Sequence, residues 1–378
     1  MSQKTPFKHL NVYYFTGTGN SGRTASWIAE SAKDMDIETI CKPIDSANPK
    51  DEIVKGKQTL LVLGMPTHGF SPPYSMFRFA LMLPRAKGTK AAVFATRAGI
   101  LIGKLHPPGL AGFSPFLISL ILLLKGYHLR GIKTLNMPSN WIQVHPGYRE
   151  KNARIIISKS KPYFDKFADM ILSGESSFFT INNFYEFIFG LFMLPISIMY
   201  FLIGRFCLAK LNFANRSCDG CGICANICPV NAIKMTGKKK RIPYWTFGCE
   251  ACNRCIAFCP KKAIEASHQL LIFWILITMS YSVLQILHLS SYFVNLGSFT
   301  VSIREFAEVI VIYPFLFITY FIFHMLMRIP ILNRLFTFTT LTHYYTRYKE
   351  PDTKIVILNE TQRNEESRLV QRKQMNNT

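Results

Sequence analysis

Short apolar runs rich in β-branched residues alternate with amphipathic stretches over the first 175 residues. The apolar runs, which predict strands, lie at 9–15, 37–41, 59–64, 91–96 and 132–137. The stretches that predict helices lie at 21–33, 72–83, 113–126 and 148–172. Regular alternation of strands and helices is typical of a parallel sheet covered on both faces. The expected fold class is therefore α/β, with a doubly wound five-stranded parallel sheet over residues 1–175.

Three long apolar segments follow this region. Residues 187–204 carry no charge, and few polar residues interrupt 270–296 and 306–327. Each segment reaches or approaches the roughly 20 residues that span a bilayer. We expect two transmembrane helices within 269–330, and a hydrophobic segment over 176–210 that either spans the membrane or lies at its surface. A polar tail at 331–378 is expected to be loosely ordered from about Tyr348.

Eight of the ten cysteines belong to two copies of one motif. The first copy is Cys218-x2-Cys221-x2-Cys224-x3-Cys228-Pro229, and the second is Cys249-x2-Cys252-x2-Cys255-x3-Cys259-Pro260. A [4Fe–4S] cubane needs four thiolates, of which one tight loop supplies three and the other motif the fourth. Two ligand sets are therefore expected: Cys218, Cys221, Cys224 and Cys259 for one cluster, and Cys249, Cys252, Cys255 and Cys228 for the other.

Zinc is the alternative metal for these motifs, because Cys-x2-Cys pairs also bind zinc. Structural zinc sites normally use two pairs with a longer spacer, not three close cysteines followed by Cys-Pro, twice. The motifs resemble those of bacterial two-cluster ferredoxins over residues 214–265. That resemblance implies a small α+β domain at 211–268 that transfers single electrons at low potential.

A loop rich in glycine and hydroxyl groups follows the first predicted strand. It consists of Thr16, Gly17, Thr18, Gly19, Asn20 and Ser21, with Gly22 completing a dinucleotide-binding pattern. A pyrophosphate also needs an acidic residue about twenty positions later, and Glu38 is poorly placed for that. Hydroxyls interleaved with backbone N–H groups at a helix N-terminus suit a phosphate monoester instead. The loop resembles the FMN loop of flavodoxins, which implies FMN as cofactor.

Two further loops follow the third and fourth strands and add to the candidate flavin site. They contribute Pro66, Thr67, His68 and Gly69, and then Thr96, Arg97 and Gly99. Ligands of open parallel sheets lie beyond the carboxyl ends of the strands, so the flavin ring is expected here. The Pro-Thr-x-Gly loop also resembles the first flavin-flanking loop of flavodoxins. His68 and Phe70 either pack on the flavin edge or fill the loop, and Arg97 is either a flavin contact or a solvated charge.

The charge pattern predicts both a partner class and an orientation. The chain has 44 Lys and Arg against 22 Asp and Glu, a net charge of +22 that calls for an acidic partner. With 31 phenylalanines and no recognisable nucleic-acid-binding module, lipid is favoured as the partner and nucleic acid is not expected.

The distribution of basic residues predicts an orientation in the membrane. Basic residues flank 187–204 on both sides, whereas the loop between the last two apolar segments offers only Arg304. The positive-inside rule then places that loop outside, disfavours a crossing at 187–204, and puts both redox domains on the cytoplasmic side of the inner membrane.

The combination of a flavodoxin-like region with two ferredoxin-like cysteine motifs resembles the flavodoxin–ferredoxin fusion proteins of the EFR1-like family, over residues 9–170 and 214–265. The resemblance implies FMN, two [4Fe–4S] clusters and electron transfer with a protein donor or acceptor, expected to be acidic because this chain is basic. An FMN-dependent reductase, with a pocket near His106, Trp141 and His145, is the alternative, and a redox-sensing membrane protein is a third. No nucleophile–base pair stands out, so no catalytic residue is predicted and enzymatic activity stays open. Cys41 and Cys207 are expected to be structural thiols.

Overall fold

The computed structural model describes residues 5–50, 56–86, 88–101, 103, 105–237, 240–277 and 298–351. Five parallel strands form its largest sheet, in the order β2-β1-β3-β4-β5. The strands are β1 (His9–Tyr14), β2 (Glu38–Pro43), β3 (Thr59–Pro66), β4 (Lys90–Gly99) and β5 (His128–Pro138). This order is that of the flavodoxin-like doubly wound fold, so the predicted fold class is confirmed. The order reverses beside β1, where the loops after β1 and β3 diverge and leave room for a ligand.

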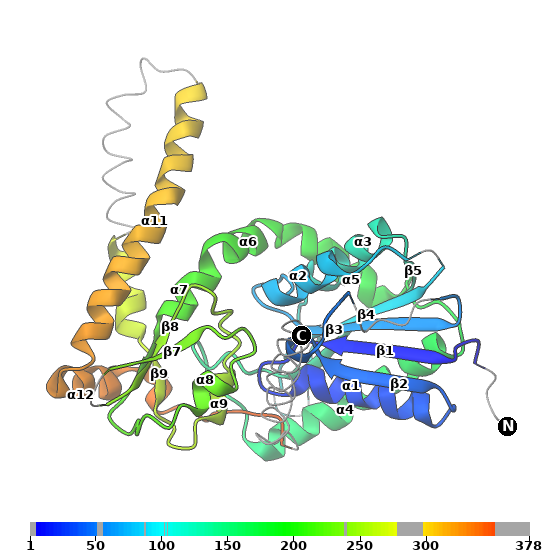
Figure 1. Cartoon of the computed structure of the whole chain (residues 1–378), viewed down its shortest axis with the longest axis horizontal. Helices are drawn as coiled ribbons and strands as arrows, with labels where there is room; N and C mark the ends of the chain where they lie inside the picture. Colours follow the sequence, from blue (N-terminus) through cyan, green and yellow to red (C-terminus); the bar gives the residue numbers. More distant parts are fainter. Residues whose placement is uncertain are drawn as a thin grey trace, which may run out of the picture.

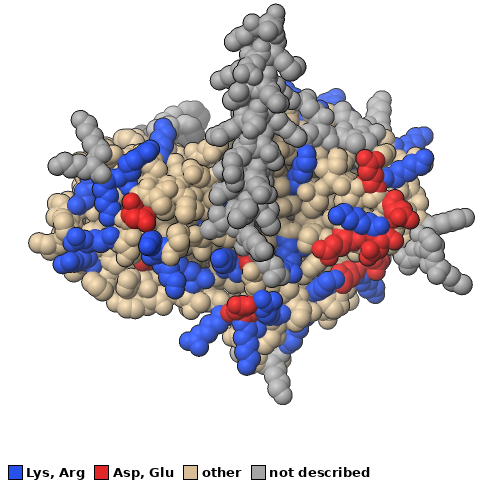
Figure 2. All heavy atoms as spheres, turned by 60° about the horizontal axis from the view of Figure 1, so that its bottom comes forward, with Lys and Arg blue, Asp and Glu red and all other residues tan. Residues whose placement is uncertain are grey.

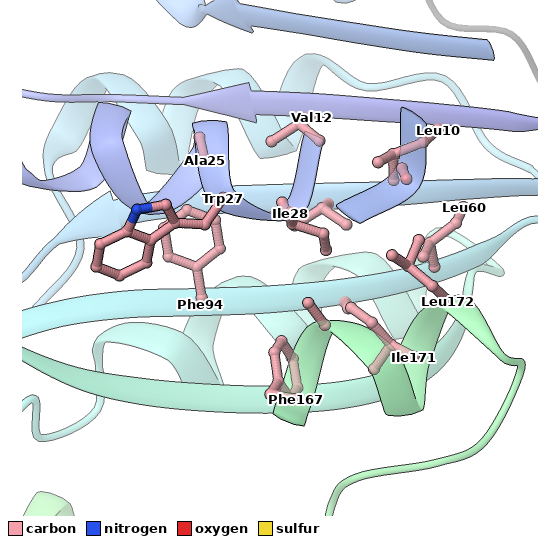
Figure 3. Packing of buried hydrophobic residues seen from close by; sticks show 14 of the residues in the cluster. Leu10, Val12, Ala25, Trp27, Ile28, Leu60, Phe94, Phe167, Ile171 and Leu172 are labelled. Carbon is pink, nitrogen blue, oxygen red and sulfur yellow. The ribbon is translucent and has the colours of Figure 1, made fainter. Parts of the chain in front are cut away.

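Two helices cover each face of this sheet (Figure 1). They are α1 (Asn20–Lys33) and α4 (Glu150–Leu172) on one face, and α2 (Tyr74–Met82) and α3 (Ser114–Leu124) on the other. Alternate residues of β3 serve the two cores: Leu60 packs with the first pair of helices and Leu61 with the second. Figure 3 shows the first core, where Trp27 of α1 and Phe167 of α4 close over the strands. A short 3-10 helix, η1 (Ile44–Ser46), follows β2.

The cysteine motifs lie in a second, smaller unit over residues 211–268, called the cluster domain here. Strand β6 (Asn212–Ala214) pairs antiparallel with β9 (Ile264–Ala266), and β7 (Ile233–Thr236) pairs antiparallel with β8 (Ile242–Trp245). Each motif contains one short helix, α8 (Ile223–Asn226) or α9 (Arg254–Phe258). The small α+β ferredoxin-like domain predicted from the motifs is therefore present.

A bent helical segment connects the two domains. It runs through α5 (Ile181–Phe192), α6 (Leu194–Met199), a π-helical turn η2 (Tyr200–Gly204) and α7 (Arg205–Lys210). Thr180 caps α5 by accepting a hydrogen bond from the backbone of Asn183, 3.1 Å away. Asn183 in turn donates to the carbonyl of Ile132 at 3.0 Å, which fastens α5 to the edge strand β5.

The last described helices are α11 (Ser298–Leu326) and α12 (Pro330–Thr339), followed by η3 (Leu341–His343). Within 306–327, which we expected to span a membrane, the side chains of Leu316, Tyr320 and Phe323 are buried in the core of the cluster domain, whereas Phe317, Ile318 and Phe321 are about half exposed. Tyr320 accepts a hydrogen bond from the backbone of Trp245, at 3.3 Å. One face of this apolar helix therefore packs against protein, while hydropathy alone predicted lipid.

Within the described residues, no single helix has the length and composition of a membrane span. Two bent pairs do so by length and composition: Ile181–Phe192 with Leu194–Lys210, bent by 68°, and Ile312–Leu326 with Pro330–Thr339, bent by 111°. A further apolar helix covers His268–Ile277, and the rest of the span predicted at 270–296 lies outside the described residues.

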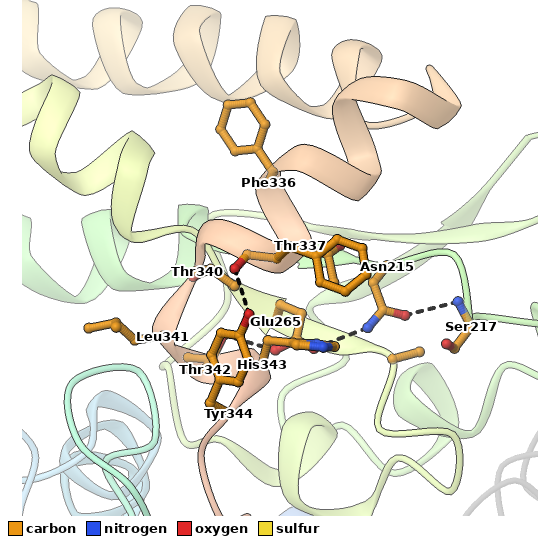
Figure 4. Close-up of polar contacts among 12 residues, drawn as sticks. Asn215, Ser217, Glu265, Phe336, Thr337, Thr340, Leu341, Thr342, His343 and Tyr344 are labelled. Atoms are coloured by element: carbon orange, nitrogen blue, oxygen red, sulfur yellow. Dashed lines mark hydrogen bonds and ion pairs between the residues drawn. The ribbon is translucent and has the colours of Figure 1, made fainter.

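The region predicted as a polar tail begins as packed structure. Tyr348 and Glu350 are only 4% and 2% exposed. The buried Glu265 of β9 accepts hydrogen bonds from Thr342 at 2.9 Å and from Asn215 at 3.0 Å (Figure 4). The same carboxylate pairs with Arg347 at 3.1 Å, so the chain up to residue 347 is fixed to the cluster domain. The loose tail expected from about Tyr348 therefore does not begin there, and residues 352–378 lie outside the described residues.

Candidate redox site

The cysteines gather in the two sets that their spacing predicts. Cys218, Cys221, Cys224 and Cys259, the outer group, line a single small pocket. Cys228, Cys249, Cys252 and Cys255, the inner group, lie close enough for their charges to act on one another. Each group takes its fourth member from the other motif, as a cubane between two such loops requires.

The loops that carry these cysteines have the backbone that cluster binding needs. Gly222 and Asn253, which follow the second cysteine of each motif, both have left-handed backbones, with φ of 78° and 61°. The residues before those cysteines, Gly220 and Ala251, are also left-handed, with φ of 80° and 51°. Backbone N–H groups turn towards sulfur as a result: that of Ala251 lies 3.4 Å from Cys249 Sγ. Such donors stabilise the charge of a thiolate.

Without a bound metal, raised pKa values keep these cysteines in the neutral thiol form. Burial raises the pKa of Cys252 to about 12, and burial with repulsion from Cys218 raises that of Cys224 to about 12. A bound metal centre deprotonates its thiol ligands outright. Bound iron would therefore convert these thiols to thiolates. Each iron of a cubane takes one protein thiolate, so the ligands stand apart. Among the described residues, no three His, Cys, Asp or Glu side chains are placed to share a single ion.

A cleft lies at the carboxyl edge of the large sheet; about 740 Å³ of empty space, open solvent included, lies in it. Most of the predicted flavin residues line it, namely Thr16, Gly17, Thr18, Asn20, Ser21, Pro66, Thr67, His68, Gly69, Thr96 and Arg97. Gly19 and Gly99 do not line the cleft. Trp141 lines it as well, but His106 and His145, which the reductase alternative would use, do not.

The phosphate loop, Thr16–Ser21, is built as an anion site at the start of α1. Gly19 has a φ of 108°, which glycine adopts without strain, and its N–H donates to Thr16 Oγ1 at 3.1 Å. No side chain caps α1, and no acidic residue stands in its first turn, so the helix N-terminus presents its N–H groups to the cleft. Ser21 shares a 2.9 Å hydrogen bond with Thr96, which ties the loop to β4.

Arg97 is neither a solvated charge nor free to bind a ligand with its whole guanidinium. It pairs with Glu186 of α5 and donates to Asn136 Oδ1 at 2.6 Å. Glu186 is fully buried and also accepts from the backbone N–H groups of Ala111 and Gly112, at 2.9 and 3.1 Å. Arg97 therefore lines the cleft with part of its side chain while its charge holds α5 against the sheet.

The cleft includes residues that the sequence did not indicate. Beyond β5 it is lined by Pro138, Ser139 and Asn140, and the π-helical turn contributes Tyr200. The cluster domain contributes Ala251, Cys252 and Asn253, which belong to the second cysteine motif. The position of Pro138–Asn140 directly after the fifth predicted strand was the available signal for that loop. Contact between two separate domains leaves no signal in the residue spacing of either domain.

Close packing joins the second motif to the phosphate loop. A Cβ added to Gly17 would lie 2.2 Å from the carbonyl oxygen of Cys252. Arg254, which is 1% exposed, donates to the carbonyl of Thr16 at 2.6 Å and pairs with Asp45 at 3.0 Å. The inner cysteine group therefore lies directly beside the cleft.

A second set of contacts fixes the same motif to α2. Glu250 accepts hydrogen bonds from Ser75 N at 2.6 Å and from Ser75 Oγ at 3.1 Å. Burial raises the pKa of Glu250 to about 7, and the bonds from Ser75 oppose that rise. Asn253 Nδ2 donates to the carbonyl of Asn140 at 3.2 Å, in the loop after β5. The motif is thus held at both ends of the contact.

The C-terminal segment Tyr345–Glu350, called the strap here, also reaches the phosphate loop. Tyr348 donates to Asn20 Oδ1 at 2.6 Å, and Glu350 N donates to the carbonyl of Thr18 at 2.7 Å. Glu350 pairs with Arg23 of α1. The strap therefore connects the cluster domain to the loop expected to bind phosphate.

Comparison with known proteins identifies one of the two domains. Residues 217–263, which contain both cysteine motifs, match the family model described as a 4Fe-4S dicluster domain. No curated protein matches the chain significantly.

Several solved structures with flavodoxin domains align with part of the chain. A short-chain flavodoxin associated with a non-canonical PDU bacterial microcompartment is 17% identical, with a TM-score of 0.31, over 44% of this chain and 99% of that one. Oxidised flavodoxin 1 from Bacillus cereus is 16% identical, with a TM-score of 0.28, over 42% of this chain and 97% of that one. Rubredoxin oxygen:oxidoreductase from Desulfovibrio gigas is 13% identical, with a TM-score of 0.29, over 44% of this chain and 37% of that one. The strand order gives the first domain a flavodoxin-like fold, and residues 217–263 match the 4Fe-4S dicluster model; together these support a redox or electron-transfer role.

Proposed function

We propose that this chain is a membrane-associated electron-transfer protein that connects FMN, two [4Fe–4S] clusters and a redox partner. The observation that carries the proposal is the position of Cys252, an expected cluster ligand that lines the same cleft as the phosphate loop. FMN exchanges electrons in pairs or singly, and iron–sulfur clusters exchange them singly. A flavin in this cleft and a cluster on the inner cysteine group would have no intervening layer of protein.

The residues of the cleft suit FMN chemically. The hydroxyls of Thr16, Thr18 and Ser21 and the N–H groups at the start of α1 form a donor set for a phosphate monoester. Thr67 Oγ1 and Asn253 Oδ1 are buried without a hydrogen-bond partner in the described part of the chain. Both residues line the cleft, so the polar edge of a flavin ring would satisfy them.

The two cysteine groups differ in how deeply they are buried, so an electron pathway through them would run between the cleft and the surface. Cys249 and Cys255 of the inner group are each 8% exposed, whereas Cys221 of the outer group is exposed. The inner group would exchange electrons with the flavin, and the outer group with molecules in solution.

Exposed apolar side chains support membrane association. Phe184 and Phe192 of α5 are 70% and 73% exposed, and Leu124 of α3 is 73% exposed. Helices α3, α5 and α6 lie along one side of the molecule, and α11 extends beyond them (Figure 1). Clusters of exposed apolar side chains often mark sites of contact with membranes or other proteins. We propose that this side rests on the cytoplasmic face of the inner membrane.

Flavin and iron analysis of anaerobically purified protein tests the cofactors. We expect about one FMN and about eight iron atoms per chain, from two four-iron clusters. Cys252→Ser should remove only the inner cluster, so that iron falls to about four and photoreduced protein no longer passes electrons to its flavin. Cys221→Ser is the matched variant: it should also lose iron while FMN stays next to an intact inner cluster. Protein that holds iron but no flavin would refute the FMN assignment.

Vesicle flotation tests the membrane proposal separately. The full chain should float with vesicles that contain phosphatidylglycerol, and Phe184→Ser with Phe192→Ser should weaken that binding. Lys161→Gln, on the exposed side of α4, is the control and should leave flotation unchanged. A full chain that stays in the dense fraction would contradict membrane association but not electron transfer.

A further inference from the structure

We infer that the exposed loop Cys218–Gly222 of the outer cysteine group is the docking point for an acidic redox protein. A set of cations called the basic ring would hold that partner: Arg216, Lys240, Arg241, Lys261 and Arg328. The inference rests on the proposed electron-transfer function and adds the site and the chemistry of the partner. An electron enters or leaves most readily where a cluster approaches the surface, and Cys221 is the cysteine that the structure exposes there.

The members of the ring come together from distant parts of the chain. Lys240 Nζ lies 3.4 Å from the carbonyl oxygen of Arg216, two positions before Cys218. The backbone of Arg241 packs against Gly220, where an added Cβ would lie 2.7 Å from the Arg241 carbonyl oxygen. Lys261 lines the cavity of the outer group together with Cys218 and Cys221. Loop, hairpin and second motif thus present their cations around one cluster.

A recess beside the loop extends the ring to the base of α11. Arg216, Lys240 and Arg328 all line this space, which has an empty volume of about 870 Å³. At its floor, Asn333 is 4% exposed and its Oδ1 has no hydrogen-bond partner among the described residues. An acidic segment of a partner protein would bring both carboxylates for the cations and N–H donors for this oxygen.

Little negative charge opposes the ring. The acidic residues of the described part of 211–268 are Asp219, Glu250 and Glu265. Glu250 and Glu265 are buried and hydrogen-bonded within the protein, so Asp219 alone offsets the ring at the surface. In Figure 2, Lys and Arg spread over the left, where the cluster domain lies in Figure 1, whereas most Asp and Glu in this view gather at the right. Opposite charge on a partner would raise the association rate and orient the encounter towards this face.

The test measures reduction of the clusters by an acidic electron carrier. The probe is a photoreduced acidic flavodoxin, mixed rapidly with the full chain at several salt concentrations. The variant Arg216→Gln/Lys240→Gln/Lys261→Gln removes three ring charges. A control variant, Lys33→Gln/Lys151→Gln/Lys166→Gln, removes three exposed charges from α1 and α4 of the other domain. At low salt we expect the ring variant to be reduced at least about tenfold more slowly, with a weaker salt dependence, and the control to stay within about twofold.

Other outcomes separate this inference from the proposed function. Photoreduced 5-deazariboflavin, a small reductant without the partner's charge, should reduce the clusters of all three proteins equally. If electrons from it do not reach the flavin in the wild-type chain, the proposed function fails whatever the ring does. Equal slowing in the ring variant and the control would overturn the docking site, as would no slowing in either. Loss of binding to phosphatidylglycerol vesicles with unchanged reduction by flavodoxin would assign the ring to lipid instead.

Discussion

Replacing Gly17 by alanine tests the contact between the cluster domain and the phosphate loop. The added Cβ would lie 2.2 Å from the Cys252 carbonyl oxygen, whereas ordinary contact begins at about 3.4 Å, so the two backbones must separate by about 1.2 Å. Neither side of the contact is a flexible side chain, and overpacking of this kind costs about 1–3 kcal/mol. For domains of this size that cost lowers Tm by roughly 3–10 °C.

Two measurements follow the consequence of this separation. Thermal unfolding of the flavin-free protein reports the packing cost without any contribution from weaker FMN binding. Bleaching of the flavin absorbance after photoreduction of the clusters reports electron transfer, which should slow because the inner cysteine group moves away from the cleft.

Gly248→Ala is the matched control, because it lies on the same cysteine motif with space to spare. Its Cβ would be 3.6 Å from Thr246 Oγ1 and 3.7 Å from Ala232 Cβ, both ordinary contacts. The control should keep the wild-type Tm and rate. If Gly17→Ala also keeps both, the Cys252 loop does not pack on Gly17, and the arrangement behind the proposed function is wrong.

Three further substitutions probe the surroundings of the cleft. Arg254→Met should destabilise the protein by about 3–5 kcal/mol, because it leaves Asp45 without its buried counter-charge, and adding Asp45→Asn should restore part of the lost Tm. Tyr348→Phe removes the 2.6 Å hydrogen bond to Asn20, so the FMN dissociation constant should rise about fivefold by titration, with iron content unchanged. Burial lowers the pKa of His68 to about 4 from 6.5, so the unfolded chain binds a proton between those values and the folded chain does not. Stability should therefore fall as pH drops from 6.5 towards 4, and His68→Asn should flatten that dependence of Tm; an unchanged slope would show that the ring is solvated.

The parts that the sequence predicted well depend on local spacing. Two-residue gaps bring three thiolates onto one loop whatever the rest of the chain does, so the cysteine sets could be assigned from the motif. Apolar runs separated by helices likewise specify a parallel sheet, and its carboxyl edge locates the loops at Thr16 and Thr67.

Contacts between distant segments were not predictable in the same way. The apolar character of 306–327 indicated a membrane span, because hydropathy does not distinguish a helix face that meets lipid from one that meets protein. Leu316, Tyr320 and Phe323 share one face of α11, and the hydroxyl of Tyr320 finds its partners in the cluster domain. A tyrosine that needs a hydrogen-bond partner in mid-helix was the signal that this face is not lipid-exposed.

Arg97 and the strap illustrate a second limit. Whether an arginine in a loop is solvated or buried depends on a carboxylate supplied elsewhere, here Glu186 of α5. Charged residues near the C-terminus indicate disorder by composition, but Tyr348 among them is 4% exposed. Aromatic residues within such a charged segment were the available indication that it packs.

The strap has a consequence for the order in which the protein is made. The hydrogen bond from Tyr348 to Asn20 joins residues 328 positions apart, so one of the first segments to leave the ribosome waits for one of the last described segments. Both cysteine motifs are synthesised in that interval, and chains fold largely from the N-terminus as they emerge. The core of the cluster domain likewise waits for late residues, because Leu316, Tyr320 and Phe323 of α11 complete it. The phosphate loop and the cluster domain therefore receive their last described neighbours from the same late part of the chain, and we expect both to reach their final packing only after it is synthesised.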